Sequence, residues 1–333
     1  MRKFVLLSLL IPVFALTGVA SAGGTTINLV AFSTPKPVME TLISKFNKTS
    51  AGAGVSFTQS YGASGAQAKA IIAGLPADIA FLSNGLDVDS LANAGLVAKN
   101  WATKYPQGGM AANSVVAFVV RPGNPKHIHS WADLLKSGVQ VVTPDPFPSG
   151  GAKWNVLAAY GAERKMGKSD KNATAYVQKM FHHVVQQDTS ASNAMNTFLS
   201  GKGDVLLTYE SEAYTALAAG KSLQIVIPKQ SLLIQLPMVP LKNANAKATA
   251  FIKYIHSYGA QKVFVRAGYR PVIKAVLSNK SLKTWKTRFN AGAHVIFKIS
   301  DPIFRGWTKA NKLWFSSNGR MIKIEQAVGG PTS

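Results

Sequence analysis

Three short turns carry most of the residues that could bind a ligand. Their sequences are "GASGA", "SGG" and "TSA", and each precedes a predicted helix. The first N–H groups of a helix have no partner within the helix and carry partial positive charge, so such turns can bind anions. Serine hydroxyls add donors, and glycines let the backbone approach a ligand closely. The ligand candidates are Ser64, Ser149, Gly150, Gly151 and Ala191.

Helical patterns follow all three turns. After Ser64, apolar residues recur at the spacing of one helix face, at Ala68, Ile71, Ile72 and Leu75. We therefore expect Ser64 and Ser149 to be N-cap residues, with Gly65 a weaker ligand candidate. The third helix is expected to stop at Gly201.

Neither the turn at Ser64 nor the turn at Ser149 contains an acidic residue. A pocket made only of donors suits an oxyanion without a proton. Hydrogen phosphate would also need an acceptor, and without one its proton would remain unpaired at a cost of about 1 to 3 kcal/mol. The pattern therefore favours a sulfate-like anion.

The elements that position these turns are predicted to be alternating strands and helices. Strands are expected at 27–32, 55–60, 77–83, 114–120, 139–144, 182–187, 204–209 and 223–228, where Val, Ile, Phe and Tyr are enriched. A chain of 333 residues can form about two ordinary domains. We expect an α/β fold of two lobes, with chain crossings near 112–114 and 209–212 and a hinge between the lobes.

The composition excludes several kinds of site. The chain has no cysteine, so disulfides, thiolate nucleophiles and cysteine metal sites are excluded. Its net charge is +23, which favours encounter with anions. The basic residues are scattered and form no nucleic-acid motif, so the charge is interpreted as a solubilising surface, with an acidic exterior as the hypothesis for its use. No cofactor is expected.

The first residues are typical of a secretory signal peptide. A basic head and an apolar run precede Ala20, Ser21 and Ala22, which predicts cleavage after about Ala22. The alternative is a retained membrane anchor, which the short run disfavours. We expect the mature protein to be exported to the periplasm.

Other chemistry is less well supported. "GASGA" differs by one residue from the nucleophile elbow of serine hydrolases, which leaves a hydrolase using Ser64 as an alternative, but no histidine lies in a catalytic pattern. His127 and His129 could bind a metal, but no third ligand is evident, so no metal site is predicted. Asp78, Asp87 and Asp89 are interpreted as turn and cap residues.

The residues around these turns resemble a known family. "SYGASGAQAKAIIAGLPADIAFLS" is similar to the Ser-His-Gly-Gly-Ser-Gly-x-Gln-Ala block of the periplasmic sulfate- and thiosulfate-binding proteins of ABC importers. "RPGNPKHIHSWADLL", "TPDPFPSGGAKWN", "NTFLSGKGDVLLTYESEA", "AGYRPV" and "FRGWTKANKLWFSSNG" continue the likeness across nearly all of the mature chain.

The resemblance implies roles for several residues. Ser64 would donate from one lobe, Ser149, Gly150 and Gly151 would donate from the other, and Ala191 would add a backbone N–H. Tyr209 stands where the family has a tryptophan donor. Two further departures are Ser33, in place of an aspartate, and Ser192, in place of an arginine; both are weaker ligand candidates.

The resemblance also implies a fold and a function. The fold would be a type II periplasmic-binding-protein fold, each lobe a mixed sheet flanked by helices, with the ligand in the cleft. Lobe 1 would comprise 23–112 and about 211–265, lobe 2 would comprise 113–210, and 266–333 would pack across both. The protein would be a monomer without catalytic activity that delivers sulfate or thiosulfate to a permease and its ATPase. Molybdate or phosphate remain alternative ligands.

Overall fold

The computed structural model describes residues 25–291 and 294–332. The strands are β1 (Thr26–Phe32), β2 (Ser56–Gly62), β3 (Ile79–Phe81), β4 (Met110–Val120), β5 (Val141–Pro144), β6 (Val184–Asp188), β7 (Val205–Tyr209), β8 (Gln224–Val226), β9 (Gln230–Pro240) and β10 (Val295–Phe297). The helices are α1 (Lys36–Phe46), α2 (Ser64–Ile72), α3 (Gly85–Asn93), α4 (Trp101–Lys104), α5 (Gly150–Lys165), α6 (Asp170–His182), α7 (Ala191–Leu199), α8 (Glu210–Ala218), α9 (Ala246–Ile255), α10 (Tyr258–Arg266), α11 (Lys283–Asn290), α12 (Trp307–Trp314) and α13 (Arg320–Val328). The predicted signal peptide, 1–22, lies outside the described residues.

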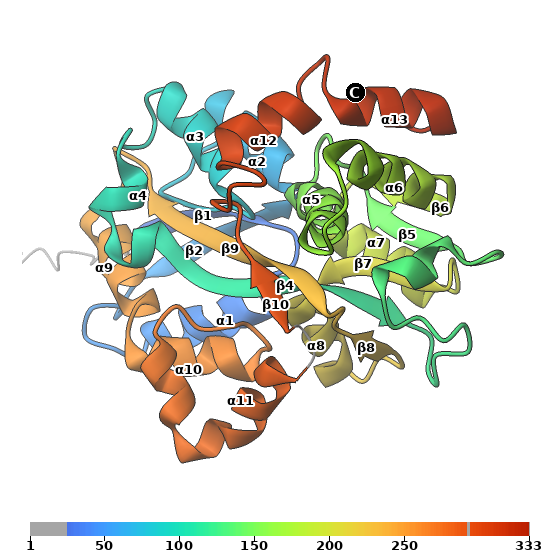
Figure 1. The fold of residues 1–333 in the computed structure, drawn as a ribbon. Helices are drawn as coiled ribbons and strands as arrows, with labels where there is room; N and C mark the ends of the chain where they lie inside the picture. The colour runs from blue at the N-terminus through green and yellow to red at the C-terminus, as the bar shows by residue number, and fades with distance from the viewer. Residues whose placement is uncertain (1–24, 292–293, 333) are drawn as a thin grey trace, which may run out of the picture.

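The strands form one mixed sheet with two parallel halves. Their order is β2-β1-β3-β9-β4-β7-β5-β6, with β10 paired to β9 and β8 to β4. β1 is parallel to β2 and β3, and β5 is parallel to β6 and β7. β4 and β9 are antiparallel and connect the halves, and Figure 1 shows them running through the middle of the molecule.

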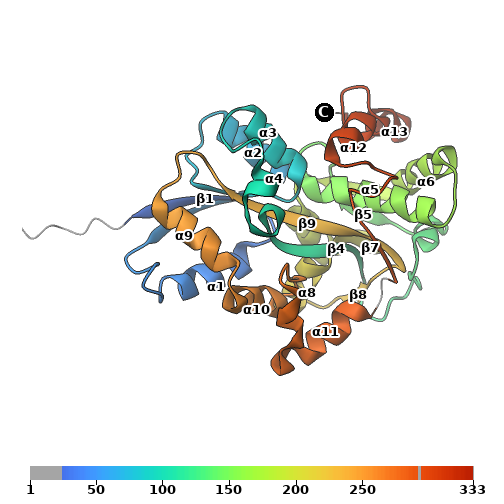
Figure 2. The same cartoon turned by 60° about the vertical axis from the view of Figure 1, so that its left-hand side comes forward.

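Helices cover both faces of the sheet. In Figures 1 and 2, α1, α9 and α10 lie on the opposite side of β1 and β9 from α2 and α3. α1 has a half-buried pattern, because Val38, Met39 and Leu42 face the core while its lysines face solvent. The predicted α/β fold with a mixed sheet flanked by helices is confirmed.

Helix α5 is the most buried helix of the second half. Almost every residue from Gly150 to Glu163 is buried, including the full Trp154 side chain. Its apolar residues therefore extend around the helix, which explains why a single stripe is not obvious in its sequence. The prediction that Trp154, Leu157, Ala158 and Gly161 face the core is confirmed.

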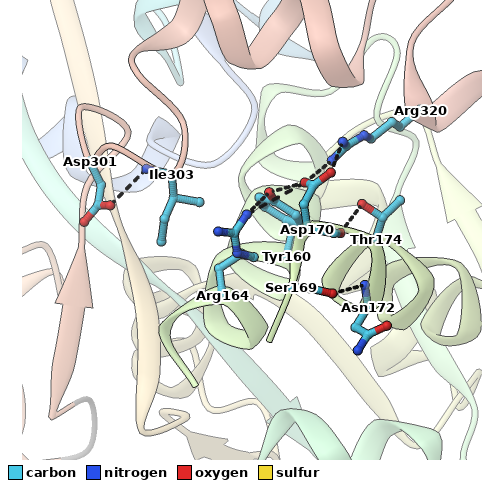
Figure 3. Close-up of polar contacts among 9 residues, drawn as sticks. All are labelled: Tyr160, Arg164, Ser169, Asp170, Asn172, Thr174, Asp301, Ile303 and Arg320. Carbon is cyan, nitrogen blue, oxygen red and sulfur yellow. Dashed lines mark hydrogen bonds and ion pairs between the residues drawn. The ribbon is translucent and has the colours of Figure 1, made fainter. Parts of the chain in front are cut away.

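The C-terminal segment packs on α3, α5 and α6. The Trp307 ring meets the Trp154 ring edge-on at 4.6 Å, and Trp307 also adjoins Gly85 of α3. On α13, Arg320 donates to both carboxylate oxygens of Asp170 at 2.9 and 2.6 Å, beside Tyr160 and Arg164 (Figure 3). Across 25–291 and 294–332, no helix is long and apolar enough to span a membrane.

Candidate functional site

The predicted ligand turns lie at the carboxyl ends of the two parallel halves. β1, β2 and β3 lead into α1, α2 and α3, while β5, β6 and β7 lead into α5, α7 and α8. The two sets touch directly, since the Gly65 N–H donates to the Pro148 carbonyl at 3.1 Å and the Trp154 indole N–H donates to the Ser83 carbonyl at 2.7 Å. Ligands of open α/β sheets bind at this edge.

Ser64 begins α2 and is buried. Its hydroxyl donates to Asp87 at 2.5 Å and accepts from the Ser83 N–H at 2.9 Å. The prediction that Ser64 is the N-cap is wrong, because Ala63 holds that position without a side-chain cap bond. The Ser64 hydroxyl is already engaged by Asp87 and Ser83, so the group available to an anion is its backbone N–H.

Asp87 supplies an acid that the turn itself lacks. Its Oδ2 also accepts from Asn84 Nδ2 at 2.9 Å, and its backbone N–H donates to the Asn84 side chain at 3.0 Å, which caps α3. Asn84 is therefore the cap of α3, and Asp87 lies in the first turn of that helix. The carboxylate also holds Ser64 in place, because Oδ2 accepts from both Ser64 and Asn84.

The turn at Ser149 has the predicted geometry. Ser149 is the N-cap of α5 and its hydroxyl accepts from the Ala152 N–H at 3.4 Å. A Cβ on Gly150 would overlap Ser83 Oγ and Asn84 Nδ2 and would lie 3.2 Å from Ser64 Cβ. A Cβ on Gly151 would lie 3.0 Å from the Tyr209 hydroxyl oxygen. The two glycines thus bring bare backbone against Ser64 and Tyr209.

The third turn begins α7. Ser190 is its N-cap and accepts from the Asn193 N–H at 3.2 Å, and Ala191 is buried. The helix ends near the predicted stop, at Leu199. The Ser192 N–H donates to Ser33 Oγ at 3.4 Å, so the two residues that depart from the family pattern lie side by side.

Tyr209 lies at the end of β7, immediately before α8. It is buried, and its ring packs against Phe32 at 5.7 Å. Burial raises the pKa of Tyr209, while hydrogen bonding to Ser83 opposes the rise. The phenol therefore remains protonated near neutral pH and can donate one hydrogen bond.

Sequence reasoning missed Ser83 and Asn84 as site residues. Ser83 forms hydrogen bonds with three residues around the site. Its N–H donates to the Ser64 hydroxyl, its hydroxyl accepts from the Asn84 side chain, and its carbonyl accepts from the Trp154 indole N–H. The sequence carried a signal for them, because Ser83 ends the predicted strand 77–83 and Asn84 follows it directly. Both lie at the edge of the sheet where the other candidate ligand turns are found. Polar residues at the carboxyl end of a buried parallel strand deserve to be counted with the site.

A small cavity lined in part by the basic residue Lys153 adjoins the turn at Ser64. A cavity of about 220 Å³ is lined by residues that include Gly65, Asp87, Phe147 and Lys153. The buried Lys153 ammonium donates to the Phe147 carbonyl at 2.9 Å, and burial lowers the pKa of Lys153. Its positive charge lies on the same helix turn as Gly150 and Gly151.

The geometry does not reproduce a hydrolase or a metal centre in the part of the chain that the structure describes. The Ser64 hydroxyl pairs with a carboxylate, whereas the ring nitrogens of His183 and His256 bond to backbone carbonyls. Asp133 caps its own turn with Ser130. Within 25–291 and 294–332, no three His, Asp or Glu side chains are grouped to hold a metal ion.

Comparisons with known proteins agree on one family. The family model described as bacterial extracellular solute-binding protein matches residues 27–270. A sulfate-binding protein of Synechococcus elongatus is 33% identical, over 93% of this chain and 91% of its own length. A thiosulfate-binding protein of Pseudomonas aeruginosa is also 33% identical, over 97% and 99%. The solved structure of the sulfate-binding protein SubI from Mycobacterium tuberculosis superposes with a TM-score of 0.81 at 36% identity, covering 86% of this chain and 98% of that one.

Proposed function

The chain belongs to the family of bacterial extracellular solute-binding proteins, and from that premise we propose that it captures sulfate or thiosulfate for an ABC importer. Curated relatives and a solved structure that carry these two ligands in their names are similar to it along most of its length. The proposed ligand set is Ser64, Ser149, Gly150, Gly151, Ala191 and Tyr209, with Ser33, Gly65 and Ser192 as weaker members.

One observation carries the assignment to a small oxyanion. The start of α5 is pressed against Ser83 and Ser64 so closely that Gly150 has no room for a Cβ. The start of α5 therefore meets Ser64 at the start of α2, with Tyr209 against Gly151. We propose that the start of α7, where the Ser192 N–H donates to Ser33, completes the same site. Converging helix N-termini supply N–H donors and partial positive charge to an anion.

The donor set favours an anion without a proton. Asp87 is the carboxylate bonded to Ser64, and its Oδ2 accepts from Ser64 and Asn84. The proposed ligand set itself contains no carboxylate, so the proton of hydrogen phosphate would find no charged acceptor among the ligands. A charge-assisted hydrogen bond contributes about 1.5 to 3 kcal/mol, so we expect sulfate and thiosulfate to bind more tightly than phosphate.

We propose the division of the chain that the resemblance implies. Lobe 1 comprises 23–112 and about 211–265, lobe 2 comprises 113–210, and 266–333 packs across both. An anion held from both lobes favours the closed arrangement, because the open one lacks half of the donors. The direct contact of Gly65 with Pro148 is the kind of contact that closure would create.

The transport role extends beyond the chain itself. We propose that the signal peptide is cleaved after about Ala22, that the mature protein acts as a monomer in the periplasm, and that it docks on a permease driven by an ATPase. It performs no covalent chemistry in this role and requires no cofactor.

Isothermal titration calorimetry of the mature chain tests the function. Sulfate, thiosulfate, molybdate and phosphate are compared at one pH and one salt concentration. We expect sulfate or thiosulfate to bind at least about tenfold more tightly than phosphate, a difference of 1.4 kcal/mol. Equal or tighter phosphate binding would overturn the donor argument, and tighter molybdate binding would replace the proposed ligand.

A further inference from the structure

A buried carboxyl group lies behind the third ligand turn. Glu212 is in the first turn of α8 and is 6% exposed. Its Oε2 accepts a hydrogen bond from the Thr208 hydroxyl, and the Ser192 hydroxyl is its second hydrogen-bonding neighbour. Ser192 follows Ala191 directly, so Glu212 supports the turn that offers the Ala191 N–H.

The groups around Glu212 do not neutralise it. From β7, the neighbour is Tyr209, and from the segment after α10 it is Tyr269; burial raises the pKa of both phenols, so both stay uncharged near neutral pH. Arg270 is paired with Glu210 of α8, because its guanidinium donates to the two Glu210 carboxylate oxygens at 2.6 and 3.0 Å. The other charged groups of the site, Asp87 and Lys153, lie on α3 and α5.

This environment places the ionisation of Glu212 in the physiological range. Burial raises the pKa of Glu212 from 4.5 to about 7, and the hydrogen bonds from Thr208 and Ser192 act in the opposite direction. The hydroxyls of Thr208 and Ser192 can serve either charge state, because a hydroxyl both donates and accepts. The carboxyl can therefore change its charge without breaking the local structure.

We propose that Glu212 couples anion capture to the uptake of one proton, so that the carboxyl is neutral whenever a dianion occupies the donor site. The inference rests on the proposed function. A dianion at the Ala191 N–H would be separated from Glu212 by little more than the Ser192 turn, in a region shielded from water. Two negative groups interact strongly at such short range and low dielectric.

Thermodynamic linkage gives the measurable consequence. If the bound anion holds Glu212 protonated, then a rising pH must weaken anion binding once free Glu212 ionises. Sulfate keeps the same charge from about pH 5.5 to about pH 8.5. Its own titration therefore does not contribute to the pH dependence of binding, whereas the titration of phosphate would. Sulfate is therefore the probe that isolates the protein group.

The first experiment measures sulfate binding to the mature protein by calorimetry from about pH 5.5 to 8.5, in buffers of different ionisation enthalpy. Above about pH 7 we expect Kd to rise about tenfold per pH unit, with proton uptake approaching about one per sulfate. Below about pH 6, Kd should be constant, with little proton uptake. A flat profile with measurable binding would overturn the proposal.

Two variants identify the group responsible. Glu212→Gln keeps the shape and the hydrogen bonds but cannot ionise, so its Kd should be independent of pH and close to that of the wild type at low pH. Glu325→Gln is the matched control, since Glu325 is another fully buried carboxyl, on α13, that contacts Gln187 instead of a proposed ligand. Its profile should match that of the wild type.

Other results are equally decisive. Persistence of the pH slope in Glu212→Gln would assign it to another group, with the buried Lys153 as the obvious candidate, and would overturn the proposal. If Glu212→Gln fails to fold, Thr208→Val replaces it: losing the hydroxyl should raise the pKa of Glu212 and move the onset of weakening to higher pH, whereas an unmoved onset would contradict the role of Glu212. Absence of sulfate binding at every pH would instead reject the proposed function.

Discussion

Ser64 shows how one hydrogen bond separates two kinds of chemistry. A serine between small residues at a helix start can be a nucleophile or an anion donor, and the sequence pattern left both open. In the structure, its hydroxyl proton points to Asp87 and its oxygen accepts from the Ser83 N–H. The side chain therefore holds α2 against α3, and the backbone N–H of Ser64 remains for an anion.

Removing this hydroxyl should weaken both the fold and the site. In Ser64→Ala, the buried Asp87 carboxylate loses one donor and the Ser83 N–H loses its acceptor. The free energy of unfolding should fall by about 1 to 3 kcal/mol. Urea unfolding measures this change, with Ser56→Ala as control because Ser56 pairs with Thr26 in an exposed position. Equal stability of Ser64→Ala and the control would show that the contact is unimportant.

Local signals predicted one cap correctly, and distant contacts escaped prediction. Ser149 was recognisable because an N-cap bonds to a residue three positions later, whereas the cap predicted at Ser64 is wrong. The partners of Ser64 are 23 and 19 positions away, at Asp87 and Ser83. No local pattern reports which turn faces which, so the candidate ligand positions rest on the resemblance, which did not include Ser83 and Asn84.

Among the secondary-structure elements, the central strand β9 was obscured in the sequence by its prolines. All eight predicted strands exist, but β9 was not predicted, although it lies between β3 and β4. It contains Pro237, and a proline argues against a central strand because it cannot donate to a neighbour. The sheet tolerates Pro237 because the β4 ladder is irregular opposite it, between Met110 and Ala112. The three-residue strand β10 was not predicted either.

Helix α5 offers a test of how the C-terminal segment is held. A Cβ on Gly161 would overlap the rings of Phe297 and Phe304, so β10 and the segment after it sit directly on this glycine. Gly161→Ala should force these rings apart and destabilise the fold by about 1 to 3 kcal/mol, despite the higher helix propensity of alanine.

Chemical unfolding of Gly161→Ala beside Gly259→Ala provides the measurement and its control. Gly259 is also helical, but a Cβ there would meet only Ser257 Oγ, at 3.9 Å. A Gly161→Ala variant more stable than the wild type would mean that the C-terminal segment does not press on α5.

At the scale of the whole molecule, an α/β chain is divided into two parallel halves joined by β4 and β9. The sequence indicated this class because strands and helices alternate, but it could not indicate the lobe contacts, which depend on packing between distant turns. The chain has few carboxylates, as its net charge of +23 reflects, and several of them are buried. The buried ones give the fold an unusual response to pH.

Stability should decrease as the pH rises through neutrality. Burial is the largest cause that raises the pKa of Glu212 and of Glu325 from 4.5 to about 7. Between these values the folded state holds protons that the unfolded state has lost, so their stabilising effect is present near pH 4.5 and is lost as the pH approaches 7 and above. The two groups together should change the free energy of unfolding by a few kcal/mol, on the order of 1.4 per pH unit for each group.

Denaturant unfolding without added anion from about pH 5 to 8 measures this dependence. Glu325→Gln should remove roughly half of it and leave the rest to Glu212. A wild-type stability that rises with pH across this interval would contradict the assigned directions.

We propose that an oxyanion is held where the start of α5 meets Ser64 and Ser83. Calorimetry of sulfate binding to Gly150→Ala tests it most directly, because one methyl group there must displace Ser83 and Asn84. We expect Gly150→Ala to lose at least about a hundredfold in affinity, or 2.7 kcal/mol, while Gly259→Ala binds like the wild type. Unchanged sulfate affinity in a folded Gly150→Ala protein would place the anion elsewhere.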